Sequence, residues 1–276
     1  MTIYLKDIWP IENTDEFKIH FAKEAKEDNH AYQPLDVWLR DESEWKKWQE
    51  YRPNRNDFNL PYIFSLMDFY HEGKAETWLF GGVFKVLKRH NDRYEVERME
   101  LGARFIGRLK IKYSYKDRIT RPFMENHYNK FEVKEILSEP YSGRSFPGFE
   151  DIDLSFEELE VLIENDRSDW KTALENVKGV YLVTDTKTNK GYVGVAYPEL
   201  GGIWARWRCY IETGDGGNAA IHTLINRYGL EYGRKFFRFA LLEHRPLNTP
   251  DKKILSREKY WKNILRTRGD AGLNRN

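Results

Sequence analysis

The sequence is poor in several residue types and patterns that mark particular classes of protein. Cysteine occurs once, as Cys209, so neither an internal disulfide nor a multi-cysteine zinc site can form. No run of about 18 apolar residues occurs, so no membrane span is expected. The opening stretch MTIYLKDIWP lacks the basic and apolar regions of a secretory signal. These absences predict a chain that works in a reducing cytoplasm.

Net charge is also small, at +1, and by itself indicates no class of partner. The charges are unevenly spread, because residues 14–50 are rich in Asp and Glu whereas residues 252–275 are basic. A basic end on a nearly neutral chain suits local contact with phosphate groups. Aromatic residues make up 15% of the 276 residues, which predicts packed cores in one large domain or two modest ones.

The front of the chain combines helical and strand-like patterns. Residues 2–9 read as a first strand, residues 16–27 repeat apolar positions at helical spacing, and a second helix begins near Asp41 or Ser43. Four segments then alternate with a period near two: 77–90, 93–101, 104–115 and 130–139. Gly81–Gly82 inside the first of them indicates a bulge or a barrel corner. We expect an α+β fold, with a mixed β-barrel-like domain carrying helices at the front.

A domain boundary is expected in the polar stretch 165–168, just after a helix that begins near Ser155. The predicted domains are therefore 1–165 and 166–276. Within the second domain, residues 179–185 and 191–196 flank the turn-forming segment TKTNK and predict a β-hairpin. Tyr181 and Tyr192 lie on its two strands, each close to glycine residues that permit close approach of another group. Taken alone, two such phenols are as well explained by cross-strand packing.

Further elements follow this hairpin in a fixed order. They are the tripeptides GVY (179–181) and YVG (192–194), then WARW (204–207), GGN (216–218), Glu258 and GLN (272–274). Over roughly residues 170–276 this order resembles the GIY-YIG nuclease family. The resemblance implies an α/β domain with a small antiparallel sheet flanked by helices. It also implies a phosphodiester-hydrolysing, metal-dependent endonuclease acting on double-stranded DNA.

The resemblance implies roles for individual residues. Glu258 would hold one Mg²⁺ or Mn²⁺ through its hard carboxylate oxygens. Arg206 would clamp the scissile phosphate with its guanidinium group. Tyr181 would activate or orient the attacking water, and Tyr192 would contact the phosphate or the attacking group.

Two more residues complete the implied catalytic set, and two others are DNA-backbone candidates. Tyr210 lies one helical turn beyond Arg206, where the family carries His or Tyr, and Asn274 would support the site by hydrogen bonds. Lys190, in the hairpin turn, and Arg208 are the candidates for contact with the DNA backbone.

Several of these residues also have an ordinary structural explanation. Glu258 and Lys262 have the i, i+4 spacing of a surface ion pair. Arg208 could replace Arg206 as the phosphate ligand, since both flank Trp207. His222 and His244 are the kind of histidine that usually packs or is solvated. The chain also departs from the family at Val195, where a small hydroxyl residue is usual, and at Asp215, where GHGGN is often read.

The front domain resembles the PUA and EVE-like group in its strand pattern, which implies a reader of modified bases. Trp78 and Phe80, two apart on one strand face, would wall a pocket for a flipped base, although both also suit a core. Reader and nuclease together imply a modification-dependent restriction enzyme for modified cytosine. Alternating basic residues would contact the backbone or form a solvated sheet face: Arg104, Arg108, Lys110, Lys112, Arg118 and Arg121.

Other functions stay open at this point. A sequence- or structure-specific DNase would cut unmodified DNA, a catalytically silent protein would only bind nucleic acid, and a third alternative is an RNA-directed nuclease. A double-strand break by single-site modules requires a homodimer or two successive nicks.

Overall fold

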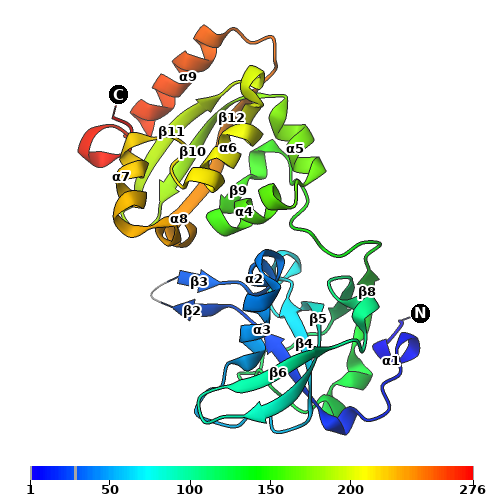
Figure 1. The fold of residues 1–276 in the computed structure, drawn as a ribbon. Helices are drawn as coiled ribbons and strands as arrows, with labels where there is room; N and C mark the ends of the chain where they lie inside the picture. The colour runs from blue at the N-terminus through cyan, green and yellow to red at the C-terminus, as the bar shows by residue number, and fades with distance from the viewer. Residues whose placement is uncertain (1, 28–29, 276) are drawn as a thin grey trace. The chain divides into compact units, whose positions relative to one another are not determined.

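The computed structural model describes residues 2–27 and 30–275, which form two compact units (Figure 1). Unit 1 comprises Met1–Tyr141 and unit 2 comprises Ser142–Asn276. The division therefore falls before the boundary expected at 165/166. The reason is that the segment after Ser142 supplies a strand and a helix that pack inside unit 2.

Unit 1 is built on a mixed sheet with the order β1-β4-β5-β7-β8, and β6 pairs with the second half of β5. β1 runs parallel to β4, and the other pairs are antiparallel. Over the described residues the strand order does not close into a barrel, so the barrel-like fold that we expected is not confirmed. The strands are β1 (Phe17–Ala22), β4 (Tyr62–Asp68), β5 (Thr77–Arg89), β6 (Tyr94–Met99), β7 (Leu109–Lys112) and β8 (Glu132–Ile136), with a separate hairpin of β2 (Ala25–Glu27) and β3 (His30–Tyr32).

Two predictions for the start of the chain are wrong. The expected first strand is a short helix, α1 (Leu5–Ile8), and the expected helix over 16–27 is β1 followed by β2. Every residue of β1 is buried, so the pattern that suggested one apolar helix face belongs to a strand covered on both sides. The remaining helices are α2 (Pro34–Arg40) and α3 (Glu42–Glu50), and the Asp41 side chain accepts from the Ser43 amide at 2.7 Å to begin α3 as predicted.

The predicted bulge at Gly81–Gly82 is confirmed. The β4–β5 register shifts there, with Ser65 opposite Gly82 and Leu66 opposite Phe80. A Cβ on Gly81 would lie 2.7 Å from the ring of Trp45, whose indole N–H donates to the Gly81 carbonyl at 3.0 Å. The strand can therefore carry a buried tryptophan against its backbone only because residue 81 has no side chain.

Unit 2 contains a four-stranded antiparallel sheet with the order β11-β10-β12-β9. The predicted hairpin is confirmed, and Asn189 adopts a φ of 55° in its turn. β9 was not predicted, because three residues carry too short a pattern to recognise. The strands are β9 (Asp153–Ser155), β10 (Lys178–Asp185), β11 (Lys190–Ala196) and β12 (Phe237–Arg245).

Helices cover both faces of this sheet (Figure 1). On one face lie α4 (Phe156–Glu164), α5 (Ser168–Glu175), α6 (Gly202–Thr213), α7 (Ala219–Tyr228) and α8 (Leu230–Phe236), and on the other lies α9 (Asp251–Ile264). α4 begins with the predicted Ser155 cap, which forms a reciprocal capping box with Glu158. The sheet therefore has a hydrophobic cluster on each of its faces.

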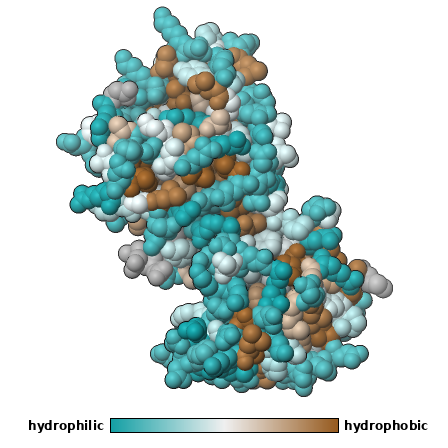
Figure 2. All heavy atoms as spheres, viewed as in Figure 1, coloured by the Kyte–Doolittle hydropathy of each residue, from teal (hydrophilic) through white to brown (hydrophobic). Residues whose placement is uncertain are grey.

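The face of each unit that Figure 2 shows is mainly polar. Figure 2 shows hydrophilic side chains over most of the visible face, with apolar groups scattered between them. None of the helices in the described ranges is long and apolar enough to cross a membrane.

Candidate active site

The β-hairpin places the two motif tyrosines on one face of the unit 2 sheet. Tyr181 pairs with Gly194 and Val183 pairs with Tyr192, so the two phenols are diagonal neighbours with ring centroids 6.3 Å apart. A Cβ on Gly194 would lie 2.5 Å from both the ring carbon and the hydroxyl oxygen of Tyr181. The Tyr181 ring therefore occupies the space that a side chain at position 194 would need.

Helix α6 brings Arg206 and Tyr210 onto the same face. The Nε of Arg206 donates to the Tyr181 hydroxyl at 2.9 Å, and the Tyr181 and Tyr210 hydroxyls lie 3.4 Å apart. The Arg206 guanidinium also lies 5.5 Å from the centre of the Tyr210 ring. Four residues that the sequence placed in one site are therefore together, and we name Tyr181, Tyr192, Arg206 and Tyr210 the phenol–arginine cluster.

Burial decides the protonation of the phenols. Tyr181 is fully buried, and burial raises its pKa to about 12 against the opposing effect of Arg206. Burial likewise raises the pKa of Tyr210 well above the ordinary phenol value. Both groups are therefore neutral hydrogen-bond donors at physiological pH. A protonated phenol cannot remove a proton from water, and the fully buried Tyr181 hydroxyl contacts Arg206 and Tyr210, so Tyr181 is suited to position Arg206 and not to act as the base.

Arg206 carries a positive charge without a carboxylate neighbour. Within residues 2–27 and 30–275, its ionisable contacts are phenols and none is an Asp or Glu. Its neighbour Arg208 differs, because that guanidinium forms an ion pair with Asp166 at 3.3 Å and lies over Trp204. Of the two candidate phosphate ligands, Arg206 is thus the one in the phenol–arginine cluster.

Asn274 fastens the edge strand that carries Tyr192. Its amide group accepts from the Val193 N–H and donates to the Val193 carbonyl, both at 2.9 Å, while the Leu273 N–H donates to the Gly191 carbonyl at 2.9 Å. Asn274 is 2% exposed. The predicted support by hydrogen bonds is therefore support of the β11 backbone, beside Tyr192.

Glu258 lies on α9, which packs on the opposite sheet face from Tyr181. It pairs with Lys262 at 3.0 Å, the ion pair that the spacing also predicted, and both side chains are largely buried. The described residues contain no group of three or more His, Cys, Asp or Glu side chains that could hold a metal ion. One carboxylate fits only an ion such as Mg²⁺ that takes its other ligands from water and substrate phosphate.

The remaining predicted residues lie outside the cluster. Lys190 begins β11, opposite Asp185, and is partly buried. Trp78 and Phe80 are 0% exposed in the core of unit 1, where the Trp78 indole donates to the Tyr113 carbonyl at 2.8 Å and Phe80 packs against Phe64. These two rings are core aromatics and present no face to a flipped base.

A loop and helix beside the cluster hold residues that sequence reasoning did not place in the site. The Nδ1 of His222 lies 2.6 Å from a carboxylate oxygen of Asp215, and its Nε2 lies 2.8 Å from the Asn226 amide nitrogen. A Cβ on Gly216, next to Asp215, would lie 2.6 Å from the Tyr210 ring. The departure from GHGGN drew attention to Asp215, but a separation of seven residues across a turn does not predict its contact with His222.

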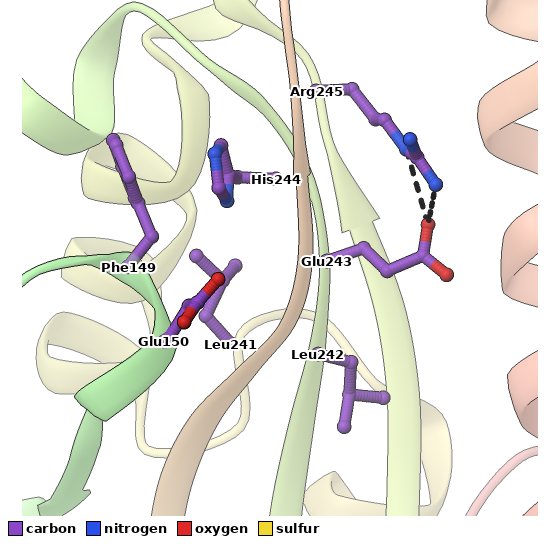
Figure 3. Close-up of a pocket in the computed structure, with 7 residues that line it drawn as sticks. All are labelled: Phe149, Glu150, Leu241, Leu242, Glu243, His244 and Arg245. Carbon is purple, nitrogen blue, oxygen red and sulfur yellow. Dashed lines mark hydrogen bonds and ion pairs between the residues drawn. The ribbon is translucent and has the colours of Figure 1, made fainter.

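A cavity of about 350 Å³ lies along the part of β12 that β9 does not pair. Figure 3 shows His244 beside Phe149 on one side of the strand, and Glu243 with Arg245 on the other. The rings of Phe149 and His244 are stacked 4.2 Å apart. The cavity is lined by Phe149, Glu150, Leu241, Leu242, Glu243, His244 and Arg245, so it shares no residue with the phenol–arginine cluster.

Comparison with known proteins is limited. No protein-family model and no curated protein sequence matches the chain. One similar solved structure is the catalytic domain of the homing endonuclease I-TevI, with 26% sequence identity and a TM-score of 0.28. The similarity covers 36% of this chain and 98% of the I-TevI chain. A second is a point mutant of the catalytic domain of the intron endonuclease I-TevI, with 25% sequence identity and a TM-score of 0.28. The similarity covers 36% of this chain and 92% of the mutant's chain. A TM-score this low is not evidence of a shared fold.

Proposed function

We propose that the chain is a metal-dependent endonuclease of the GIY-YIG kind that hydrolyses phosphodiester bonds in DNA. The observation that carries this proposal is the Arg206 guanidinium, which is oriented by a buried phenol and has no carboxylate partner in the described part of the chain. A partly buried arginine without a counter-ion is a ready ligand for an anion, and its planar fork matches a phosphate.

Each member of the site has a distinct task in this proposal. Arg206 binds and neutralises a non-bridging phosphate oxygen, while the neutral Tyr181 phenol holds the guanidinium in place. Tyr192 lies at the exposed side of the pair and contacts the phosphate or the attacking water. Glu258 would hold Mg²⁺ or Mn²⁺, which when bound would supply Lewis-acid stabilisation of charge on a phosphate. This role rests on the family resemblance and not on the geometry, because Glu258 lies on the opposite face of the sheet from Tyr181.

The finer proposal is that unit 1 selects the DNA, with a modified cytosine as its target. Its support is the separation of the chain into two compact units, of which only unit 2 holds the phenol–arginine cluster. Since Trp78 and Phe80 are buried in a core, recognition by unit 1 would have to use other side chains.

Cleavage of one plasmid prepared with unmodified, 5-methyl, 5-hydroxymethyl or glucosylated cytosine tests both levels of the proposal. Arg206→Ala is compared with Arg208→Ala, a matched arginine two positions along the same helix that is bound to Asp166. We expect Arg206→Ala and Glu258→Ala to abolish cutting, and Arg208→Ala to reduce it far less.

The substrate pattern then separates the alternatives. Cutting confined to a modified plasmid supports a modification-dependent restriction enzyme, whereas equal cutting of all four leaves a sequence- or structure-specific DNase. No cutting of any plasmid with or without Mg²⁺ and Mn²⁺, despite binding, would overturn the nuclease proposal and favour a silent binding protein or an RNA substrate.

A further inference from the structure

Three members of the phenol–arginine cluster, Tyr181, Tyr210 and Arg206, do not accept a proton near neutral pH. Burial keeps Tyr181 and Tyr210 protonated, and Arg206 stays charged. Hydrolysis of a phosphodiester needs a water molecule that loses a proton as it attacks. Unit 2 contains two imidazoles, His222 and His244, and His244 is stacked on Phe149 beside a cavity that has no residue of the cluster.

His222 is held in the form that a proton acceptor requires. An aspartate oxygen accepts the Nδ1 proton at 2.6 Å, so the neutral ring carries its lone pair on Nε2, toward which the Asn226 amide donates at 2.8 Å. The His222 side chain is 58% exposed, so a water molecule that displaces the Asn226 amide can reach Nε2.

Asp215 is a firm support for that ring. Its side chain is 10% exposed and also accepts from the Gly217 N–H at 2.6 Å and from the Thr213 hydroxyl at 3.2 Å. Burial raises the pKa of Asp215, but the hydrogen bonds from His222, Gly217 and Thr213 outweigh burial, so its pKa is lower than usual. The carboxylate is therefore ionised and fixes the histidine tautomer.

The loop that carries Asp215 packs against the phenol–arginine cluster. Gly216 lies against the Tyr210 ring, since a Cβ there would be 2.6 Å from it, and Tyr210 contacts Tyr181 and Arg206. Arg275, next to Asn274, reaches the same helix face as His222, where its guanidinium donates to the Ala219 carbonyl at 3.3 Å and to the Thr223 hydroxyl at 3.2 Å. Arg275 thus adds a positive charge on the helix that carries His222, which suits an anionic substrate.

We propose that His222, oriented by Asp215, is the general base of the phosphodiester hydrolysis, a role that rests on the function proposed above. The water proton passes to the His222 Nε2, the water oxygen forms a bond to phosphorus, and one phosphorus–ester oxygen bond breaks. The departing oxygen takes a proton from solvent, and His222 later returns its proton to solvent. Asp215 acts as the positioning residue.

The test is single-turnover cleavage, with Mg²⁺, of whichever of the four plasmids the wild-type protein cuts fastest. We expect His222→Ala to slow cleavage by roughly 100-fold, the lower range for loss of a general base, with DNA binding retained. Added imidazole should restore at least about a tenth of the lost rate, because it can occupy the vacated space and accept the proton. His222→Gln, which fills the space without a basic nitrogen, should be as slow and should not respond to imidazole. His244→Ala is the matched control and should cleave at the wild-type rate.

Several results would overturn this assignment. Cleavage by His222→Ala or His222→Gln within about threefold of wild type, or no response of His222→Ala to imidazole, would leave the histidine a structural link between loop and helix. An inactive Arg206→Ala beside a fully active His222→Ala would overturn this inference and leave the proposed nuclease intact. A wild-type protein that cuts none of the plasmids would overturn both.

Discussion

Substitution of Gly194 by alanine tests whether the phenol–arginine cluster depends on the glycine of the second motif. The new Cβ would lie 2.5 Å from the ring carbon and hydroxyl oxygen of Tyr181 and 2.9 Å from the Tyr192 ring. Favourable carbon–carbon contact occurs at about 3.5–4.0 Å, so the Tyr181 ring has to move by about 1 Å. It is fully buried, with the Trp207 ring at 6.3 Å, and has little room to do so.

The expected effect is a loss of stability and a larger loss of activity. Overpacking of a filled core destabilises by roughly 1–3 kcal/mol. For a unit of this size, that corresponds to a fall of several degrees in the melting temperature of unit 2. A 1 Å movement of the Tyr181 hydroxyl would also break its 2.9 Å hydrogen bond from Arg206, so cleavage should fall by roughly 100-fold.

Gly191→Ala on the same strand is the matched control. Its Cβ would lie 3.1 Å from a methyl group of Leu182 and 3.2 Å from one of Thr267, contacts that a small side-chain rotation relieves. Calorimetry of the full chain, which can resolve the melting of the two units, would be run beside plasmid cleavage. An unchanged unit 2 transition and wild-type cleavage in Gly194→Ala would refute the argument that this glycine makes room for the Tyr181 phenol.

Three further predictions follow from contacts in both units. Asn274→Ala removes two hydrogen bonds from Val193, so we expect a loss of about 1–3 kcal/mol and faster hydrogen exchange of the Val193 amide; unchanged exchange would contradict the fastening role. Burial raises the pKa of Glu243, but hydrogen bonds led by that from Arg257 lower it to about 2, so its contribution to stability is present above about pH 4.5 and lost as pH falls toward 2. Acid titration of unfolding should show this loss in the wild type and not in Glu243→Gln. Trp78→Ala should destabilise unit 1 by about 3–5 kcal/mol, measured by calorimetry, and a stable variant with a selective loss of DNA binding would instead support the base-reading role.

Local signals in the sequence were sufficient for several elements. The turn-forming segment 186–190 between two β-branched runs predicted the hairpin, and Ser155 predicted the start of α4. The four-residue spacing of Arg206 and Tyr210 predicted their common helix face. Each of these features depends on residues that are close in sequence, so the pattern already contains the geometry.

Non-local packing decided what the sequence could not. The segment 17–22 is a strand because it is paired with β4 and covered on both faces, which overrides its helix-like spacing. The short β9 exists because its three residues pair with β12, far along the chain.

For the site, the sequence by itself determined which residue types are present and in what order. The structure brings four of the predicted residues together, namely Tyr181, Tyr192, Arg206 and Tyr210, and leaves Glu258 on the opposite face of the sheet. Only the tertiary structure decided their chemistry. Burial keeps Tyr181 protonated, because a charged phenolate loses its hydration inside the core. Asp215 becomes the orienting partner of a histidine because a loop and a helix fold against each other, a contact that no single-sequence pattern specifies.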